Sequence, residues 1–135
     1  MLIRVCMAKI HRATVTKADL NYVGSVTVDE KLLKASGIVE YQMVNINNLS
    51  NGTLWQTYVV KGKPGSGVIC LNGPPARHFQ PGDKVIIIGE AYVEPSVIED
   101  REPIVVFVTD VKNKSFKIKR HRRAMAEIGS TPTRE

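Results

Sequence analysis

The sequence has few cysteines, few aromatic residues and no long hydrophobic run, and each absence excludes a class of protein. Two cysteines, Cys6 and Cys70, are too few for a disulfide framework or a cysteine-rich metal site. Aromatic residues make up 6% of the chain, so surfaces that stack nucleic-acid bases are not predicted. Neither an 18-residue apolar run nor a signal-peptide pattern is present. We therefore expect a cytoplasmic protein with reduced cysteines and no membrane segment.

The net charge of +6 is concentrated near the C-terminus. Residues 112–123 contain seven Lys and Arg and no acidic residue, so the rest of the chain holds 12 basic and 13 acidic residues. We predict one domain over residues 1–112, close to neutral, and a basic, flexible tail over residues 113–135. Such a tail is more typical of a solvated segment or a subunit contact than of a nucleic-acid-binding surface.

Short runs of β-forming residues between turn signals predict a mainly β fold, a compact barrel with one or two short helices. One helix is expected over residues 29–37, because Asp29 suits an N-cap and Gly37 suits the position that ends a helix. Strands are expected at residues 2–7, 12–18, 40–48, 53–60, 68–71, 84–93 and 103–108.

Asn21–Glu30 alternates like a β-strand, yet Gly24 and Ser25 interrupt it. Glycine inside a strand costs stability and often marks a bulge, a bend or a close backbone approach. A bulge is one interpretation. The other is chemical, because a serine hydroxyl can attack the carbonyl of the preceding residue in a strained, water-excluded backbone. Elimination and hydrolysis of the resulting ester leave a pyruvoyl group at a new N-terminus. The residues alone leave both interpretations open.

No other catalytic motif competes with this one. The loop "GKPGSG" (62–67) lacks the Lys-Ser/Thr of a phosphate-binding loop, and no G-x-S-x-G motif is present. The histidines His11, His78 and His121 lack metal-ligand spacing, so no metal is predicted. An enzyme with this sequence must therefore make its own electrophile or borrow a cofactor.

The segment "MAKIHRATVTKADLNYVGSVTVD" (7–29) closely resembles the pyruvoyl-dependent aspartate 1-decarboxylases, which convert L-aspartate to β-alanine for pantothenate synthesis. The resemblance covers roughly residues 3–110. It implies a double-psi β-barrel, a homotetramer, and self-cleavage between Gly24 and Ser25. It also implies a covalent pyruvoyl cofactor without metal or pyridoxal phosphate, and a small amino-acid substrate. A maturation helper protein is left open as a further partner.

The resemblance also implies roles for individual residues. Ser25 becomes the pyruvoyl group, which forms a Schiff base with the substrate and accepts electrons when CO2 leaves. Tyr58 matches the proton donor, and Thr57 matches the residue that polarises the Gly24 carbonyl during cleavage. The implied self-processing residues are Gly24, Ser25, Thr57 and Asn72. The implied substrate-binding positions are Lys9, His11, Tyr22, Leu54, Asn72, Gly73, Pro74 and Pro75.

Some of these positions depart from the family pattern at the substrate end. The family has an arginine that binds the substrate's side-chain carboxylate where this chain has Leu54, and "NGAAA" is replaced by "NGPPA". Because the self-processing residues are intact, we hypothesise a decarboxylase whose substrate has changed or broadened away from L-aspartate. One alternative is an ordinary aspartate 1-decarboxylase in which Arg77 or another residue supplies the charge. A second is an unprocessed, non-catalytic barrel that acts as a binding module.

Overall fold

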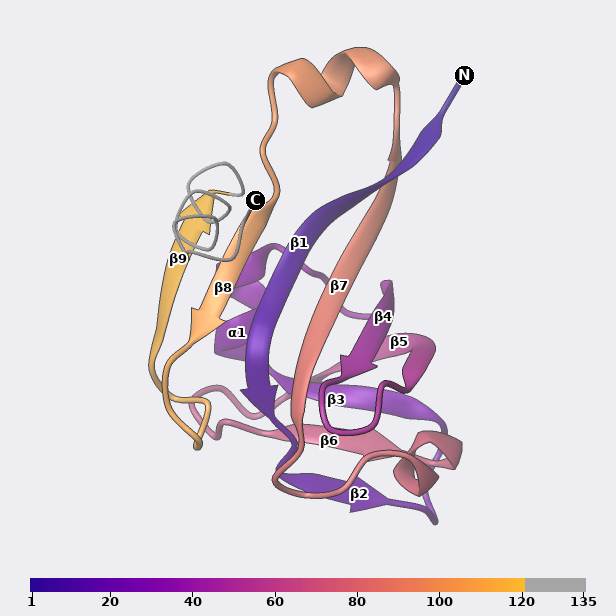
Figure 1. Cartoon of the computed structure of the whole chain (residues 1–135), viewed down its shortest axis with the longest axis vertical. Helices are drawn as coiled ribbons and strands as arrows, with labels where there is room; N and C mark the ends of the chain where they lie inside the picture. Colours follow the sequence, from indigo (N-terminus) through magenta and orange to yellow (C-terminus); the bar gives the residue numbers. More distant parts are fainter. Residues whose placement is uncertain (121–135) are drawn as a thin grey trace.

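Strands form most of the regular structure in residues 1–120, the part of the chain that the computed structural model describes (Figure 1). One α-helix, α1 (Glu30–Ser36), and two 3-10 helices, η1 (Pro74–Arg77) and η2 (Pro95–Glu99), accompany them there. The strands are β1 (Ile3–Thr14), β2 (Lys17–Asp19), β3 (Ser25–Asp29), β4 (Met43–Asn48), β5 (Leu54–Gly62), β6 (Ile69–Asn72), β7 (Lys84–Val93), β8 (Ile104–Val108) and β9 (Phe116–Arg120). The prediction of a mainly β fold with one or two short helices is confirmed.

The nine strands of this part of the chain form a mixed sheet in the order β2-β6-β3-β5-β4-β7-β1-β8-β9. The pairs β1/β8, β2/β6 and β3/β5 are parallel. The residues between β1 and β2 connect distant parts of the sheet, because the Val15 N–H donates to Asp83 O and the Thr16 N–H donates to Ile69 O, each at 2.8 Å. The sheet therefore curls around one core, as in a double-psi β-barrel.

Alternation along the strands decides which side chains enter the core. Ile10 of β1 lies opposite Ile87 of β7, which lies opposite Ile46 of β4, and all three are fully buried. Because successive residues point to opposite faces, Lys9 and His11 lie on the outer face of the same sheet. Other large, fully buried side chains of the core are Leu32, Ile69, Leu71 and Phe79.

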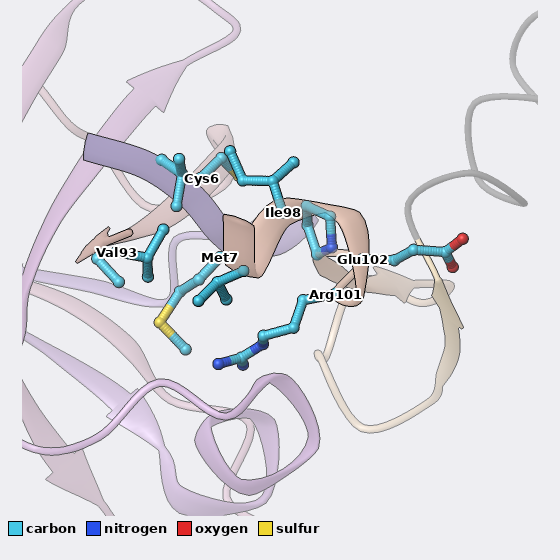
Figure 2. Close-up of a pocket in the computed structure, with 10 residues that line it drawn as sticks. Cys6, Met7, Val93, Ile98, Arg101 and Glu102 are labelled. Carbon is cyan, nitrogen blue, oxygen red and sulfur yellow. The ribbon is translucent and has the colours of Figure 1, made fainter. Parts of the chain in front are cut away.

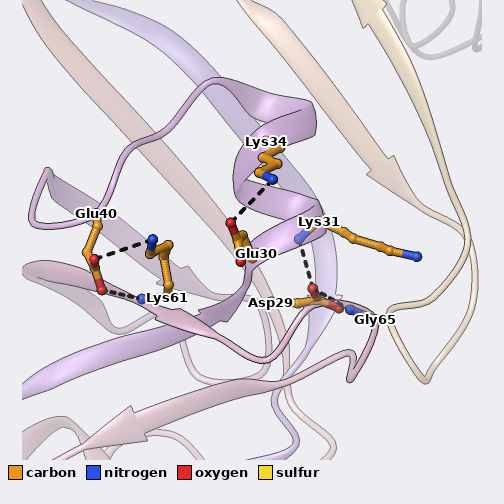
Figure 3. A network of polar contacts seen from close by, with 7 residues as sticks. All are labelled: Asp29, Glu30, Lys31, Lys34, Glu40, Lys61 and Gly65. Atoms are coloured by element: carbon orange, nitrogen blue, oxygen red, sulfur yellow. Dashed lines mark hydrogen bonds and ion pairs between the residues drawn. The ribbon is translucent and has the colours of Figure 1, made fainter.

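Helix α1 begins and ends at the residues that the sequence predicts. The Asp29 carboxylate accepts a hydrogen bond from Lys31 N at 2.8 Å, and Gly37 ends the helix with φ +84°. The same carboxylate accepts from the N–H group of Gly65 (Figure 3). It also accepts from the N–H group of Gly67, so it holds the loop before β6 as well. Within residues 1–120, no helix is long and apolar enough to cross a membrane.

Two strand predictions in the N-terminal region are wrong. The strands expected at 2–7 and 12–18 are largely one continuous strand, β1, which ends at Thr14. Lys9 and His11, which lie between the two predicted strands, are outward-facing positions of that strand. The strand expected through 21–30 begins only at Ser25, because the residues before it form a turn. Gly24 therefore precedes a strand and does not interrupt one.

The sheet continues beyond the boundary expected at residue 112. Strand β9 (Phe116–Arg120) pairs antiparallel with β8, and Asn113 is buried. The Asn113 side chain accepts from Thr14 N and donates to Thr14 O, both at 2.7 Å, and donates to Gly67 O at 2.9 Å. Residues 113–120 are thus part of the folded unit. The rest of the predicted tail, 121–135, lies outside the described residues and includes His121.

Candidate active site

Ser25 and Asn72 lie opposite each other on the paired strands β3 and β6. The Asn72 amide donates from Nδ2 to Ser25 Oγ at 2.9 Å and to Thr27 Oγ1 at 2.9 Å. The exposed fractions of the Ser25 and Asn72 side chains are only 1% and 3%. The Ser25 hydroxyl in turn points to Val23 O, at 3.5 Å. A serine hydroxyl is therefore held in a buried position by a neutral donor, directly after a glycine.

The backbone approaches itself closely around the Gly24–Ser25 bond. Gly73 has φ +80°, and a Cβ at this position would lie 2.9 Å from Gly24 Cα and 3.0 Å from Tyr22 O. The Gly73 N–H donates to Asp19 O at 2.7 Å, which fixes the turn. Only glycine permits both this dihedral angle and this contact. The predicted site residues Gly24 and Gly73 are thus brought together.

Strand β5 brings Tyr58, but not the neighbouring Thr57, to the face of the sheet that carries Ser25. Because Val26 pairs with Val59 in the parallel β3/β5 ladder, Tyr58 lies alongside Ser25 one residue earlier. Val26 and Val59 face the core, so the Ser25 and Tyr58 side chains share the opposite face. The Tyr58 ring is half-buried and packs against Tyr41 with ring centroids 6.3 Å apart. Thr57 is 8% exposed and lies on the core side of the strand.

The 3-10 helix η1 borders the buried serine. Its first residue, Pro74, lies close to the reactive backbone, because a Cβ on Gly24 would stand 3.6 Å from Pro74 Cδ. Pro75 is buried and helps to fix the helix, whereas Arg77 is exposed. Residues three apart in a 3-10 helix lie on the same side. Arg77 therefore projects from the face of η1 that carries Pro74.

Three predicted substrate-binding residues lie apart from Ser25 within one chain. Lys9 and His11 lie on the outer face of β1, and the register continues from His11 through Ile86 and Asn47 to Leu54. Adjacent strands are about 4.8 Å apart, so Lys9 is roughly 14 Å from β5, three strands away. Leu54 is 65% exposed at the other end of this outer row. The structure thus groups these three residues on one face.

His11 has an unusual environment on that face. Its ring packs edge-on against Phe107 of β8, with centroids 5.3 Å apart. Burial lowers the pKa of His11 below its usual value, and the neighbouring cations Lys9 and Arg12 lower it further. Neutral imidazole is therefore favoured. Tyr22, also a predicted pocket residue, is 59% exposed in the turn before Gly24.

The cavity shown in Figure 2 is a separate feature. It has a volume of about 290 Å³ and lies between β1, β7 and the η2 segment, with Cys6, Met7 and Ile98 in its wall. The predicted site residues do not line it. Within residues 1–120, no cluster of three or more His, Cys, Asp or Glu is suited to hold a metal ion.

Two residues of the buried site were missed by the sequence reasoning. Thr27 accepts the second Asn72 N–H, and the Cys70 thiol donates to Asn72 Oδ1 at 3.1 Å. The available signal was strand alternation, because residues 70 and 72, like residues 25 and 27, share one face. Cysteine and threonine are also common packing residues in strands. The sequence alone therefore did not distinguish a packing role from a hydrogen bond to Asn72.

Comparison with known proteins identifies the kind of site. A sequence model described as aspartate decarboxylase matches residues 1–115. The chain belongs to the aspartate decarboxylase family. It is 52% identical over 118 residues to an aspartate 1-decarboxylase of Caldicellulosiruptor saccharolyticus, covering 87% of this chain and 91% of the relative. It is 48% identical over 125 residues to an aspartate 1-decarboxylase of Lactiplantibacillus plantarum, covering 93% and 96%.

Aspartate decarboxylases of this family are amino-acid decarboxylases that use a covalent pyruvoyl group, and the family assignment makes this chain one of them. The residues present fit such a group. Ser25, from which it would derive, is buried and lies 2.9 Å from the Asn72 donor, while Gly73 leaves room for the adjacent backbone. The expectation of a pyruvoyl enzyme without metal or pyridoxal phosphate agrees with this assignment.

Proposed function

We propose that this protein is an aspartate 1-decarboxylase that cleaves itself between Gly24 and Ser25 and converts L-aspartate into β-alanine and CO2. The observation that carries the proposal is the 2.9 Å hydrogen bond from Asn72 Nδ2 to Ser25 Oγ, beside the tightly packed glycine backbone. The names of the similar proteins support aspartate as the substrate. They support this ordinary activity better than the hypothesis of a changed substrate. We also propose that the enzyme acts in the cytoplasm.

Self-cleavage needs no external oxidant. Ser25 Oγ attacks the Gly24 carbonyl carbon, the C–N bond breaks, and an ester forms. Elimination then removes the proton from Ser25 Cα and breaks the Cβ–Oγ bond, which releases the Gly24 carboxylate and leaves dehydroalanine at the new N-terminus. One water hydrolyses this group to the pyruvoyl ketone and releases ammonia. Asn72 stabilises the negative charge that develops near Ser25 during the attack, as a neutral, pre-oriented donor. Thr57 is proposed to polarise the Gly24 carbonyl.

The pyruvoyl carbonyl supplies an electron sink when CO2 leaves the substrate. Tyr58 holds the proton that the substrate's α-carbon receives, from the strand next to Ser25 and on the same face of the sheet. Asn72 orients the reacting carbonyl through its side-chain N–H donor, while Gly73, held by Asp19 O, leaves room for the backbone beside it. Pro74 and Pro75 limit the movement of the loop beside the site, because proline fixes its own φ angle.

A homotetramer is part of the proposal. On the outer face of the sheet, Lys9 and His11 of β1 lie four strands along from Ser25 of β3, and Leu54 lies four residues before Tyr58. A second copy that covers the Ser25 region with this face would supply the substrate-binding residues. If so, a mixture of Ser25→Ala and Lys9→Ala chains regains activity on co-expression, whereas each variant alone remains inactive. Failure of the mixture would contradict the shared site.

Arg77 is our candidate for the missing cation. Leu54 stands where the family has its arginine, and an aliphatic side chain gives no charge-assisted contact to a carboxylate. Arg77 is exposed on the face of η1 that also carries Pro74, next to Gly24. A guanidinium at this position suits the side-chain carboxylate of aspartate. The substitution at residue 54 is thereby compatible with the ordinary substrate.

The substrate is tested by comparing kcat/KM for L-aspartate, L-alanine and L-leucine. We expect L-aspartate to react fastest, and Arg77→Ala to raise its KM about tenfold or more through loss of a charged hydrogen bond. Leu54→Arg in the Arg77→Ala background should restore much of this loss. Arg101→Ala, an exposed arginine by the η2 segment, is the matched control. Faster turnover of a neutral amino acid would instead support the changed-substrate hypothesis.

No feature of residues 1–120 specifically favours the alternative of an unprocessed binding module. A self-cleaving enzyme and an unprocessed binding module differ in one observable, which is whether the chain is cut. The proposal leaves two routes of maturation to test. A purified precursor either cleaves itself unaided or requires a helper protein. Incubation of the purified precursor with and without cell extract distinguishes these two routes.

A further inference from the structure

We propose that Cys70 is a positioning residue for self-cleavage, whose thiol orients the Asn72 amide toward Ser25. The inference rests on the proposed function, since it takes the Gly24–Ser25 bond as the one that is cut. Cys70 and Asn72 are two residues apart on β6 and share one face of the strand. Cys70 Sγ donates to Asn72 Oδ1 at 3.1 Å, and Asn72 Nδ2 donates to Ser25 Oγ at 2.9 Å.

The amide needs such a partner because its two ends have nearly the same shape. The hydroxyl groups of Ser25 and Thr27 both donate and accept, so they are satisfied by either orientation of the Asn72 amide. With the amide rotated by 180°, Oδ1 would accept from these hydroxyls in place of Nδ2. The two hydroxyls therefore do not select the orientation.

The thiol does select it. A cysteine S–H is a donor, while its sulfur is only a weak acceptor. It therefore pairs well with Oδ1 and poorly with Nδ2, which favours the observed orientation. Cys70 is buried, and burial raises the pKa of its thiol above the ordinary value, an effect that the nearby Lys17 partly opposes. The thiol thus remains protonated, and able to donate, at neutral pH.

The orientation matters for the reaction. When Nδ2 faces Ser25, the serine oxygen accepts a hydrogen bond from the amide, and its own proton is directed to Val23 O at 3.5 Å. When Oδ1 faces Ser25, the hydroxyl donates its proton to the amide, and the donor that stabilises developing negative charge is lost. Removal of the thiol should therefore slow cleavage without removing any group that touches the scissile bond.

The test measures the rate of cleavage of freshly purified precursor by intact mass. We expect Cys70→Ala to cleave about twofold more slowly, because without the thiol the two orientations of the Asn72 amide become about equally populated. Cys70→Val, which fills the space without a donor, should be equally slow. Cys70→Ser, whose hydroxyl both donates and accepts, does not select an orientation either and should be as slow as Cys70→Ala. Cys6→Ala, at the only other cysteine of the sequence, is the matched control and should be unaffected.

Urea unfolding of the same variants separates positioning from packing. A positioning role predicts the same slower cleavage in Cys70→Val and Cys70→Ser at nearly unchanged stability. Cleavage of Cys70→Ala and Cys70→Val at the original rate would overturn the inference while leaving the proposed function intact. If the original chain is not cut between Gly24 and Ser25, the proposed function itself fails, and this inference fails with it.

Discussion

The amide of Asn72 donates a hydrogen bond to the hydroxyl of Ser25 at 2.9 Å, although the two residues are 47 positions apart in the chain. The contact depends on the antiparallel pairing of β3 with β6, which sets these residues opposite each other. Within its own strand the Asn72 side chain only accepts, from Cys70 Sγ at 3.1 Å, whereas its two N–H groups donate to residues of β3. The reactive geometry is therefore a product of the barrel's topology, and local sequence alone does not create it.

Substitution of Asn72 tests this contact directly. We expect Asn72→Ala to slow self-cleavage by about a hundredfold, because the loss of a single donor to a developing negative charge costs this much in other enzymes. Asn72→Asp keeps the shape of the side chain and replaces the donor with a carboxylate. It should be at least as slow as Asn72→Ala. Denaturing gel electrophoresis measures the rate of cleavage. If Asn72→Asp cleaves at the original rate, the donor is not needed.

Gly73 tests the close backbone approach. Gly73→Ala introduces a Cβ 2.9 Å from Gly24 Cα at φ +80°, so both strain and steric overlap are expected. Gly82→Ala is the matched control, since Gly82 has φ +96° and open space around it. The control should lose about 1 kcal/mol in unfolding free energy, and Gly73→Ala clearly more. Equal losses in urea titrations would argue against the overlap.

Prediction from the sequence was most accurate for the elements that neighbouring residues determine. The helix after Asp29 and the strand Lys84–Val93 follow from capping, turn and alternation signals, and the structure has both. Strand β9 was missed because its alternating Lys residues read as a charged tail, and only pairing with β8 orders them. Cys70 was missed because its role depends on the orientation of a neighbouring amide, which no sequence pattern encodes.

Asn113 is expected to secure the C-terminal strand to the barrel. Asn113→Ala removes hydrogen bonds to Thr14 N, Thr14 O and Gly67 O, and leaves buried backbone groups without partners. A loss of about 3 kcal/mol in unfolding free energy is predicted. Lys114→Ala, at an exposed neighbouring position, should change stability by less than about 0.5 kcal/mol. Similar values for the two variants would contradict this role.

His11 should make stability depend on pH in a defined direction. Burial, Lys9 and Arg12 lower its pKa in the folded chain below the ordinary 6.5, so the unfolded chain binds the proton first as the pH falls. The stabilisation is therefore complete above pH 6.5 and is lost as the pH falls through the lower, folded pKa. His11→Gln should flatten the curve of unfolding free energy between about pH 7 and 5. Parallel curves for the two proteins would rule the effect out.

Self-cleavage between Gly24 and Ser25 is tested by the intact mass of the purified protein under denaturing conditions. We expect two species, a fragment that ends at Gly24 and a fragment that begins with a pyruvoyl group in place of Ser25. The second should be lighter than a serine-terminated fragment by the mass of ammonia, and Ser25→Ala should abolish both. A single full-length mass that persists after warm incubation, with and without cell extract, would contradict self-cleavage and favour a non-catalytic barrel.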